Sequence, residues 1–138
     1  MSSERTYEQS AVVPYRFKDG KIQILLISSR KRSRWVVPKG LIERRMTPAQ
    51  SAAKEAFEEA GIRGKVSESL IGSYTYKKWG GTCRVQVYLM HVEKKVKEWP
   101  EMFRIREWVE PEEAIARVNE PDLKNVLTAA CASLQMVK

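Results

Sequence analysis

The sequence has 138 residues, of which 43% are hydrophobic, so it can bury the core of one ordinary domain without disulfides or structural metals. Its 25 Lys and Arg residues against 17 Asp and Glu residues give a net charge of +8, which favours anionic partners such as phosphates, RNA or acidic lipid. Two cysteines and no apolar run of about 18 residues exclude a disulfide framework and a membrane-spanning helix. We therefore expect one cytoplasmic domain over residues 1–138, monomeric or homodimeric, with buried free thiols and no membrane partner.

The first part of the chain is expected to form paired strands. Val, Ile and Leu are frequent in residues 10–17 and 21–28, and the Lys18-Asp19-Gly20 segment between them is typical of a tight hairpin. A basic stretch, residues 30–34, then leads into Trp35–Gly40, which is predicted to be a short strand ended by its Pro and Gly. A polar loop of six residues follows.

A helix is predicted between Thr47 and Gly61. Thr47 suits the N-cap, Pro48 the first helical position and Gln50 the reciprocal position of a capping box, while Gly61 is a typical stop. At about 100° per residue, one side of this helix carries mostly small side chains. They are Ala49, Ala52, Ala53, Ala56, Phe57 and Ala60. Such a surface would let the helix lie close against a sheet.

The second half is predicted to add three strands and two helices to the same core. The strands are residues 65–76, 82–92 and 104–109, with a hairpin at Trp79-Gly80-Gly81 and a charged loop over residues 94–101; the helices are 110–118 and 121–136. Along residues 82–92, Val85, Val87 and Leu89 share one face, and Arg84, Gln86 and Tyr88 share the other. Helices and a mixed sheet around one core indicate an α/β sandwich.

Three glutamates of the predicted helix form a separate acidic face. Glu55, Glu58 and Glu59 lie at i, i+3 and i+4, within about 100° of the circumference and opposite the alanine-rich side. Like charges repel, so a divalent cation such as Mg²⁺, which prefers oxygen ligands, is the natural compensation. The alternative is a solvated acidic face, which is the usual role of a charge run.

The segment around these glutamates resembles the Nudix box. The pattern is Gly, five residues, Glu, seven residues, Arg-Glu, an aliphatic residue, any residue, Glu-Glu, any residue, Gly and an aliphatic residue. The sequence supplies Gly40, Glu55, Ala56, Glu58, Glu59, Gly61 and Ile62 at this spacing. Two positions depart from the pattern, because Met46 replaces its first glutamate and Lys54 replaces its arginine.

Three further segments resemble the diphosphoinositol polyphosphate and diadenosine polyphosphate branch of the Nudix family. They are Ser28-Ser29-Arg30, Arg34–Gly40, and Arg106–Val109 followed by Pro111–Ile115. The resemblance implies a Nudix-type α/β/α sandwich with a mixed central sheet and flanking helices.

The resemblance also implies a metal site and a reaction. Mg²⁺, with Mn²⁺ as a substitute, would be held by Glu55, Glu58, Glu59 and the Gly40 carbonyl, and water would attack phosphorus with one of these glutamates as the base. Family members often add an acidic residue from outside the box, for which Glu101 is our choice, with Glu93 and Glu98 as alternatives. The Met46 and Lys54 departures indicate weaker support of the metal ligands, which would lower the rate or metal affinity more than change the reaction.

The residues that would hold the substrate are less sharply indicated. Arg34 and Lys39 are the preferred phosphate ligands because they lie close to Gly40, and Arg30, Lys31 and Arg32 are further candidates. Arg84 and Tyr88 are candidate pocket residues, with surface exposure as the alternative. Trp35 and Trp79 are candidates for stacking on a base, with packing or partial exposure as the alternative. His91, the sole histidine, is assigned no catalytic role.

The sequence thus predicts a magnesium-dependent hydrolase of a phosphoanhydride bond in a dinucleoside polyphosphate, an inositol pyrophosphate or a related nucleoside diphosphate-linked substrate. Nucleotide sugars, nucleoside triphosphates and the 5′ end of RNA are alternative substrates. A second class is a Nudix-fold module with weakened turnover that binds nucleotides or RNA, for which Met46 is the first sign. A third is a basic scaffold or partner-binding domain whose glutamates are only surface. Metal-dependent product release, lost in Glu58→Gln or Glu59→Gln, would distinguish the enzyme from both.

Overall fold

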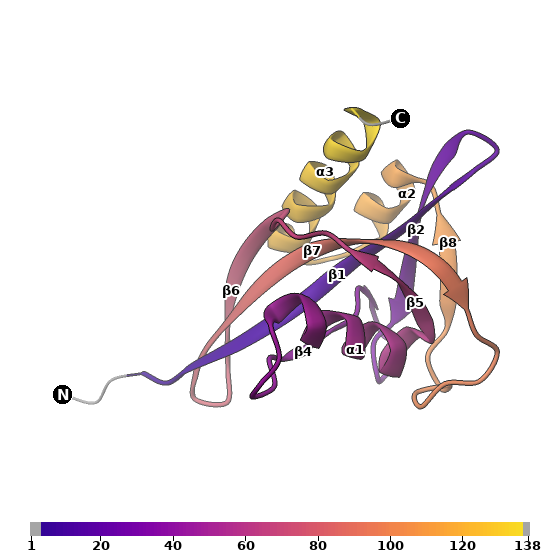
Figure 1. The fold of residues 1–138 in the computed structure, drawn as a ribbon. Helices are drawn as coiled ribbons and strands as arrows, with labels where there is room; N and C mark the ends of the chain where they lie inside the picture. Colours follow the sequence, from indigo (N-terminus) through magenta and orange to yellow (C-terminus); the bar gives the residue numbers. More distant parts are fainter. Residues whose placement is uncertain (1–3, 137–138) are drawn as a thin grey trace.

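The structure of the chain is a computed structural model and describes residues 4–136. In chain order its elements are β1 (Thr6–Lys18), β2 (Lys21–Ser28), β3 (Trp35–Val36), β4 (Lys39–Leu41), α1 (Pro48–Ala60), β5 (Ile62–Val66), β6 (Gly72–Lys78), β7 (Gly81–Lys95), β8 (Arg106–Val109), α2 (Pro111–Arg117) and α3 (Pro121–Met136) (Figure 1). None of the helices in this range is long and apolar enough to cross a membrane.

The strands form one mixed sheet built around β1 and β7. These two pair in parallel, with Thr6 opposite Thr82 and Tyr15 opposite His91, whereas the other strand pairs are antiparallel. Both long strands change partners along their length. β1 pairs first with β4 and then with β2, and β7 pairs first with β6 and then with β5. The central pair is therefore flanked by β4 and β6 over its first half and by β2 and β5 over its second half.

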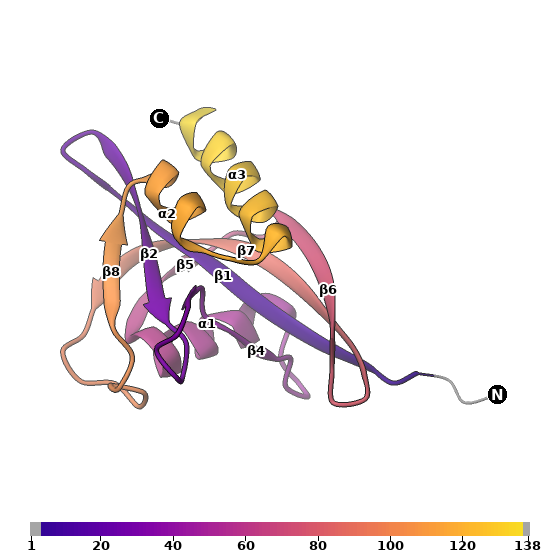
Figure 2. The ribbon, with the colours of Figure 1, turned by 180° about the vertical axis from the view of Figure 1, so that it is seen from behind.

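Helices cover both faces of the sheet (Figures 1 and 2). On one face α1 packs against Val12, Leu25, Ile27 and Met90 through fully buried alanines. On the other face α2 and α3 pack over a larger cluster that contains Val85, Val87, Ala114 and the stripe of α3. The buried residues of that stripe are Leu123, Val126, Leu127, Ala130, Cys131 and Leu134. The predicted mixed α/β sandwich is confirmed, and Cys83 and Cys131 are buried free thiols as expected.

The ends of α1 are set by the residues that the sequence indicated. The Thr47 hydroxyl accepts a hydrogen bond from the Gln50 backbone at 3.1 Å, and the Thr47 N–H donates to the Gln50 side chain at 2.9 Å. Gly61 ends the helix with φ of 63°, a left-handed conformation that suits glycine. Ala52, Ala56 and Ala60 are 0% exposed, so α1 lies close against the sheet.

Two predicted strands are divided in the structure. Trp35–Gly40 splits into β3 and β4 at Pro38, which has no N–H to donate and whose carbonyl accepts from Val12 at 3.1 Å. The predicted strand 65–76 is divided into the end of β5 and the first part of β6, with residues 67–71 between them. β5 and β6 pair with different halves of β7. The intervening turn is fastened to β7 by the Ser67 hydroxyl, which accepts from the Leu89 backbone at 3.1 Å.

The predicted polar face of β7 is only partly polar. Because α1 covers this side of the sheet, Tyr88 is 6% exposed and packs in the core beneath the helix. It therefore neither lies on the surface nor lines a pocket, contrary to both alternatives that the sequence left open.

Candidate active site

A cavity of about 1020 Å³ lies where β4, α1, β6 and the start of α3 meet. Its wall also includes the basic loop after β2 and the loop after β7. Ligand pockets commonly have volumes of about 300 to 1,000 Å³, so the cavity can hold a substrate larger than one ring system.

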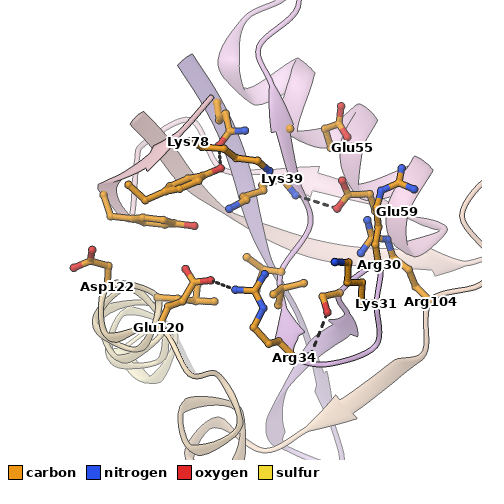
Figure 3. A pocket seen from close by; sticks show the side chains of 18 of the residues that line it. Arg30, Lys31, Arg34, Lys39, Glu55, Glu59, Lys78, Arg104, Glu120 and Asp122 are labelled. Atoms are coloured by element: carbon orange, nitrogen blue, oxygen red, sulfur yellow. Dashed lines mark hydrogen bonds and ion pairs between the residues drawn. The ribbon is translucent and has the colours of Figure 1, made fainter. Parts of the chain in front are cut away.

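One end of the cavity is acidic. Glu55 and Glu59, one turn apart on α1, line it together with Glu101 (Figure 3 shows the first two). The Glu101 N–H donates to the Glu58 carbonyl at 3.0 Å, which fixes the loop after β7 to the helix. The Glu59 carboxylate accepts from the Lys39 backbone at 3.2 Å, which fixes β4 to the same helix. Hydrogen bonds thus hold three separate segments around this end.

The surroundings of Glu55 and Glu59 favour their neutral, protonated forms. Burial raises the pKa of Glu59 to about 8, against a smaller opposing effect of the Arg104 guanidinium. Burial and the neighbouring Glu58 likewise raise the pKa of Glu55. A cation placed between two such carboxyl groups would recover the cost of ionising them.

Gly40 allows the backbone of β4 to lie against this acidic end. A Cβ atom at this position would overlap the carboxyl group of Glu55. The β4 backbone therefore lies directly against a carboxyl group, and carboxylate oxygens are donors that Mg²⁺ prefers. Among residues 4–136, no three acidic, His or Cys side chains already converge on one point, so a bound ion would have to draw the carboxylates together.

Glu58 is placed differently from Glu55 and Glu59. Its carboxylate pairs with Lys54 at 2.6 Å and lies outside the cavity wall. The i,i+4 spacing on α1 favours this pair, and one third of the side chain is exposed. Glu58 would have to release Lys54 before it could bind a metal, so its place among the ligands stays a prediction.

Lys54 has a second acidic partner that the sequence analysis did not identify. Its ammonium lies 3.4 Å from the Glu43 carboxylate, and the Glu43 N–H donates to the hydroxyl of buried Ser51 at 3.1 Å. Met46, at the position where the Nudix box has its glutamate, is 37% exposed. A carboxylate three residues earlier in the same loop therefore neutralises Lys54. Glu43 was visible in the sequence, but its spacing did not match the pattern.

We expect Glu43→Gln to raise the magnesium concentration needed for half-maximal activity about tenfold, the lower end of losses caused by removing a residue that supports metal ligands. Met46→Glu should restore most of the loss in the Glu43→Gln protein but change little in the wild type, because Lys54 needs only one loop carboxylate. Magnesium titrations of the four proteins test this coupling. Equal effects of Met46→Glu in both backgrounds would contradict it.

Of the predicted phosphate ligands, Arg30, Arg34 and Lys39 reach the cavity (Figure 3). Arg30 is 71% exposed and 3.9 Å from Glu101, and Arg34 pairs with Glu120 at 2.7 Å. The Lys39 ammonium lies 4.2 Å from the centre of the Tyr76 ring, and burial lowers its pKa. Lys31 also lines the wall.

The structure places Arg84 outside the cavity. It stands opposite Glu8 in the parallel register of β1 and β7, and the two side chains form an ion pair on the surface. The sequence could not reveal this, because the pairing depends on contacts between distant segments.

Arg104 is a component of the site that the sequence did not indicate. Its side chain is 8% exposed, pairs with Glu101 at 2.9 Å and donates to the Ser28 carbonyl at 2.9 Å. It thereby links the loop after β7 to the end of β2.

The remaining aromatic candidates have different positions. Trp79 lines the cavity and is 51% exposed, whereas Trp35 packs against the core, with Arg117 over its ring at 5.3 Å. His91 stacks on Tyr15 at 4.9 Å, away from the cavity, which is consistent with the absence of a catalytic assignment.

Comparison with known proteins places this architecture in a family. The NUDIX domain family matches residues 7–129. This chain belongs to the Nudix family. The predicted resemblance is confirmed, including its branch, since the relatives include both enzyme types named by the sequence analysis.

The relatives of this Nudix protein are named as hydrolases, which confirms the predicted enzyme class. It is 34% identical over 134 residues to the mitochondrial Nudix hydrolase 16 of Arabidopsis thaliana, covering 83% of this chain and 74% of that protein. It is 32% identical over 120 residues to diphosphoinositol polyphosphate phosphohydrolase 3-beta of Bos taurus, covering 80% and 72%. Other plant relatives are longer, and the chain spans 62% and 54% of two of them.

A solved structure supports the same fold. The binary complex of a C. elegans Ap4A hydrolase superposes with a TM-score of 0.80 and 26% identity, covering 94% of this chain and 98% of that one. Several relatives are named as mitochondrial or chloroplastic, so the cytoplasmic location of this Nudix protein stays a prediction.

Proposed function

We propose that the protein is a metal-dependent pyrophosphohydrolase that cleaves a phosphoanhydride bond in a dinucleoside polyphosphate, an inositol pyrophosphate or a related nucleoside diphosphate-linked substrate. The observation that carries the proposal is Glu59, a partly buried carboxyl group that shares a cavity with Glu55 and Glu101 and whose pKa is raised by desolvation to about 8. Perturbed acids in a cleft are characteristic of functional sites. The names of the relatives support this reaction class.

The donor set fits Mg²⁺, with Mn²⁺ as a substitute. Glu55, Glu59, Glu101 and the Gly40 carbonyl would hold it, joined by Glu58 once Lys54 is released. When bound, the ion neutralises phosphate oxygens and lowers the pKa of an attacking water. In this proposal one of the carboxylates accepts the proton of that water.

The other residues of the site bind and position. Arg30, Lys31 and Lys39 would contact the phosphates, and the Lys39 N–H holds Glu59 in place at 3.2 Å. Arg104 keeps the Glu101 carboxylate at the wall through their 2.9 Å pair. The residues therefore supply charge balance and orientation, which is most of what phosphoryl transfer requires of a protein.

The alternative of a binding module with weakened turnover rested on Met46. Because Glu43 supplies Lys54 with a loop carboxylate, the structure reduces the support for that alternative.

The test is product release from diadenosine polyphosphates, inositol pyrophosphates, ADP-ribose, nucleoside triphosphates and RNA with a 5′ triphosphate, each with magnesium, with manganese and with chelator. We expect metal-dependent cleavage of at least one of them. Binding without cleavage at any metal concentration, in a folded protein, would favour the module instead.

A further inference from the structure

The carboxyl end of α1 is covered by the segment that follows β7. The last carbonyl groups of a helix have no partner within it, so each needs a donor from elsewhere. Four successive carbonyls at this end, those of residues 58–61, each accept one hydrogen bond from residues 96–106. The donors are the Glu101 N–H to Glu58 at 3.0 Å, the Trp99 indole N–H to Glu59 at 3.1 Å, the Arg106 guanidinium to Ala60 at 3.0 Å and the Val96 N–H to Gly61 at 2.9 Å. Another segment of the chain therefore holds the end of the helix.

Trp99 fills the space beside the helix end. Its side chain is partly buried, and a Cβ atom added to Gly61 would lie 2.8 Å from the indole ring, which is too close for two carbon atoms. The Arg106 guanidinium lies over the same ring, 3.7 Å from its centre, and also donates to the Val96 carbonyl at 2.9 Å. The ring and the guanidinium are thus packed against the helix end as one unit.

The last turn of α1 carries the acidic residues of the candidate site. This turn, which lies wholly within the described residues, contains no basic side chain, and Glu58 and Glu59 belong to it. A helix has partial negative charge at its carboxyl end, so acidic side chains are unfavourable there unless a donor or a cation offsets them. Arg106 brings a guanidinium to this end from β8, and Trp99 brings an N–H group. These two side chains therefore supply what the helix itself lacks.

The same segment also brings Glu101 to the cavity. Glu101 follows Trp99 by two residues, and its side chain lines the cavity together with that of Glu59. Trp99 and Arg106 themselves lie outside the cavity wall. The indole bond to the Glu59 carbonyl and the backbone bond from Glu101 to the Glu58 carbonyl thus fix two carboxylates of the acidic end relative to each other.

We propose that Trp99 and Arg106 are positioning residues, which hold the last turn of α1 so that the carboxylates of Glu59 and Glu101 meet the same cation. The inference rests on the proposed function for the identity of that cation. A helix end that loses such donors frays, and a carboxylate on a frayed turn must be ordered again when the cation binds. Both side chains act on the cation only through the backbone of α1.

The experiment measures the dissociation constant for Mn²⁺ by electron paramagnetic resonance in the wild type and in Trp99→Phe. Phenylalanine keeps an aromatic ring against Gly61 and under Arg106 but removes the N–H that the Glu59 carbonyl accepts. We expect the constant to rise about tenfold, the lower end of the losses caused by removing residues that orient metal ligands.

Trp108→Phe is the matched control for Trp99→Phe. The Trp108 indole N–H is buried and has no hydrogen-bond partner among residues 4–136. The same chemical change should therefore alter the Mn²⁺ dissociation constant less than about twofold, since no hydrogen bond is lost.

Arg106→Met tests the second positioning residue and should also weaken Mn²⁺ binding. Arg106→Lys keeps the charge and one donor, so it should recover part of the loss. The control is Arg16→Met, because Arg16 also lies over a tryptophan ring, that of Trp108 at 4.2 Å, but donates to the Gln23 side chain instead of to α1. A purely structural role would lower the Tm of the Arg106 variants and leave the Mn²⁺ affinity of the folded protein unchanged.

Product release separates failure of this inference from failure of the proposed function. At saturating metal we expect Trp99→Phe to lower kcat and leave KM unchanged, because Trp99 lies outside the cavity wall. If no substrate is cleaved but Trp99→Phe weakens Mn²⁺ binding and Trp108→Phe does not, the proposed function fails and the positioning role stands. An unchanged Mn²⁺ affinity in Trp99→Phe, or equal losses in the two tryptophan variants, would overturn the positioning role even if the wild type cleaves its substrate.

Discussion

Glu59→Gln is expected to lower the metal-dependent hydrolysis rate about 10³-fold, equivalent to about 4 kcal/mol of transition-state stabilisation. Glu59 lies at the acidic end of the cavity, and its carboxylate also accepts the Lys39 N–H. Glutamine keeps the size and one acceptor oxygen but cannot carry the negative charge that a cation needs. Steady-state rates over a magnesium titration, with Glu68→Gln as an exposed control, measure the effect. A rate within threefold of the wild type would contradict the assignment of Glu59.

The same substitution should stabilise the metal-free protein. Burial raises the pKa of Glu59 above its ordinary value of 4.5 to about 8, so the folded state favours the protonated carboxyl group. The contribution of Glu59 to the free energy of unfolding is therefore fully present below about pH 4.5 and is lost as the pH rises through about 8. At pH 8.5 with chelator we expect Glu59→Gln to raise the Tm by about 4 °C, with a smaller difference at pH 6. Saturating magnesium should stabilise the wild type more than the variant.

Arg104→Met is expected to lower the free energy of unfolding by about 3 kcal/mol, because it leaves the partly buried Glu101 carboxylate with only the exposed Arg30, 3.9 Å away, as a cation. The guanidinium also donates to the Ser28 carbonyl at 2.9 Å, so a second buried acceptor loses its partner. For a chain of this length the loss corresponds to a fall in Tm of about 10 °C. Denaturant unfolding followed by circular dichroism, together with a thermal scan, measures both quantities.

Arg32→Met is the matched control for that substitution. Arg32 also contacts the loop after β7, where it donates to the Phe103 carbonyl at 2.7 Å, but its side chain is exposed. We expect a change below about 1 kcal/mol. Equal losses in the two variants would show that the loop contact, rather than the buried charge pair, provides the stability.

Local signals predicted most of the fold. The capping box of Thr47 and Gln50, the Gly61 stop and the hairpin glycines act over a few residues, so the sequence alone places α1 and the turns correctly. Such signals do not report which segments become neighbours. The division between β5 and β6 depends on how they pair with β7, and the burial of Tyr88 depends on where α1 lies.

The residues of the candidate site also differ in whether local sequence spacing or the tertiary fold brings them together. Glu55, Glu59 and Gly40 follow from spacing within one loop and helix, and Glu101 was chosen, ahead of Glu93 and Glu98, only through the family resemblance; all four line the cavity. Arg104 and the carboxylates of Glu120 and Asp122 at the start of α3 come together only through the tertiary fold. The same holds for Glu8, which pairs with Arg84 outside the cavity. Glu58 shows that correct spacing does not determine which cation a carboxylate meets.

The parallel pairing of β1 with β7 also has a consequence for how the chain reaches its native state. Thr6 stands opposite Thr82 and Tyr15 opposite His91, so the central strand pair closes only after most of the polypeptide has been synthesised. Long-range parallel pairing slows folding, because loop-closure entropy is lost before the contacts form. Until then β1, whose residues 11–15 are apolar, has an open edge, a feature that promotes association between nascent chains. We therefore expect slow refolding and strong dependence of the folded yield on protein concentration.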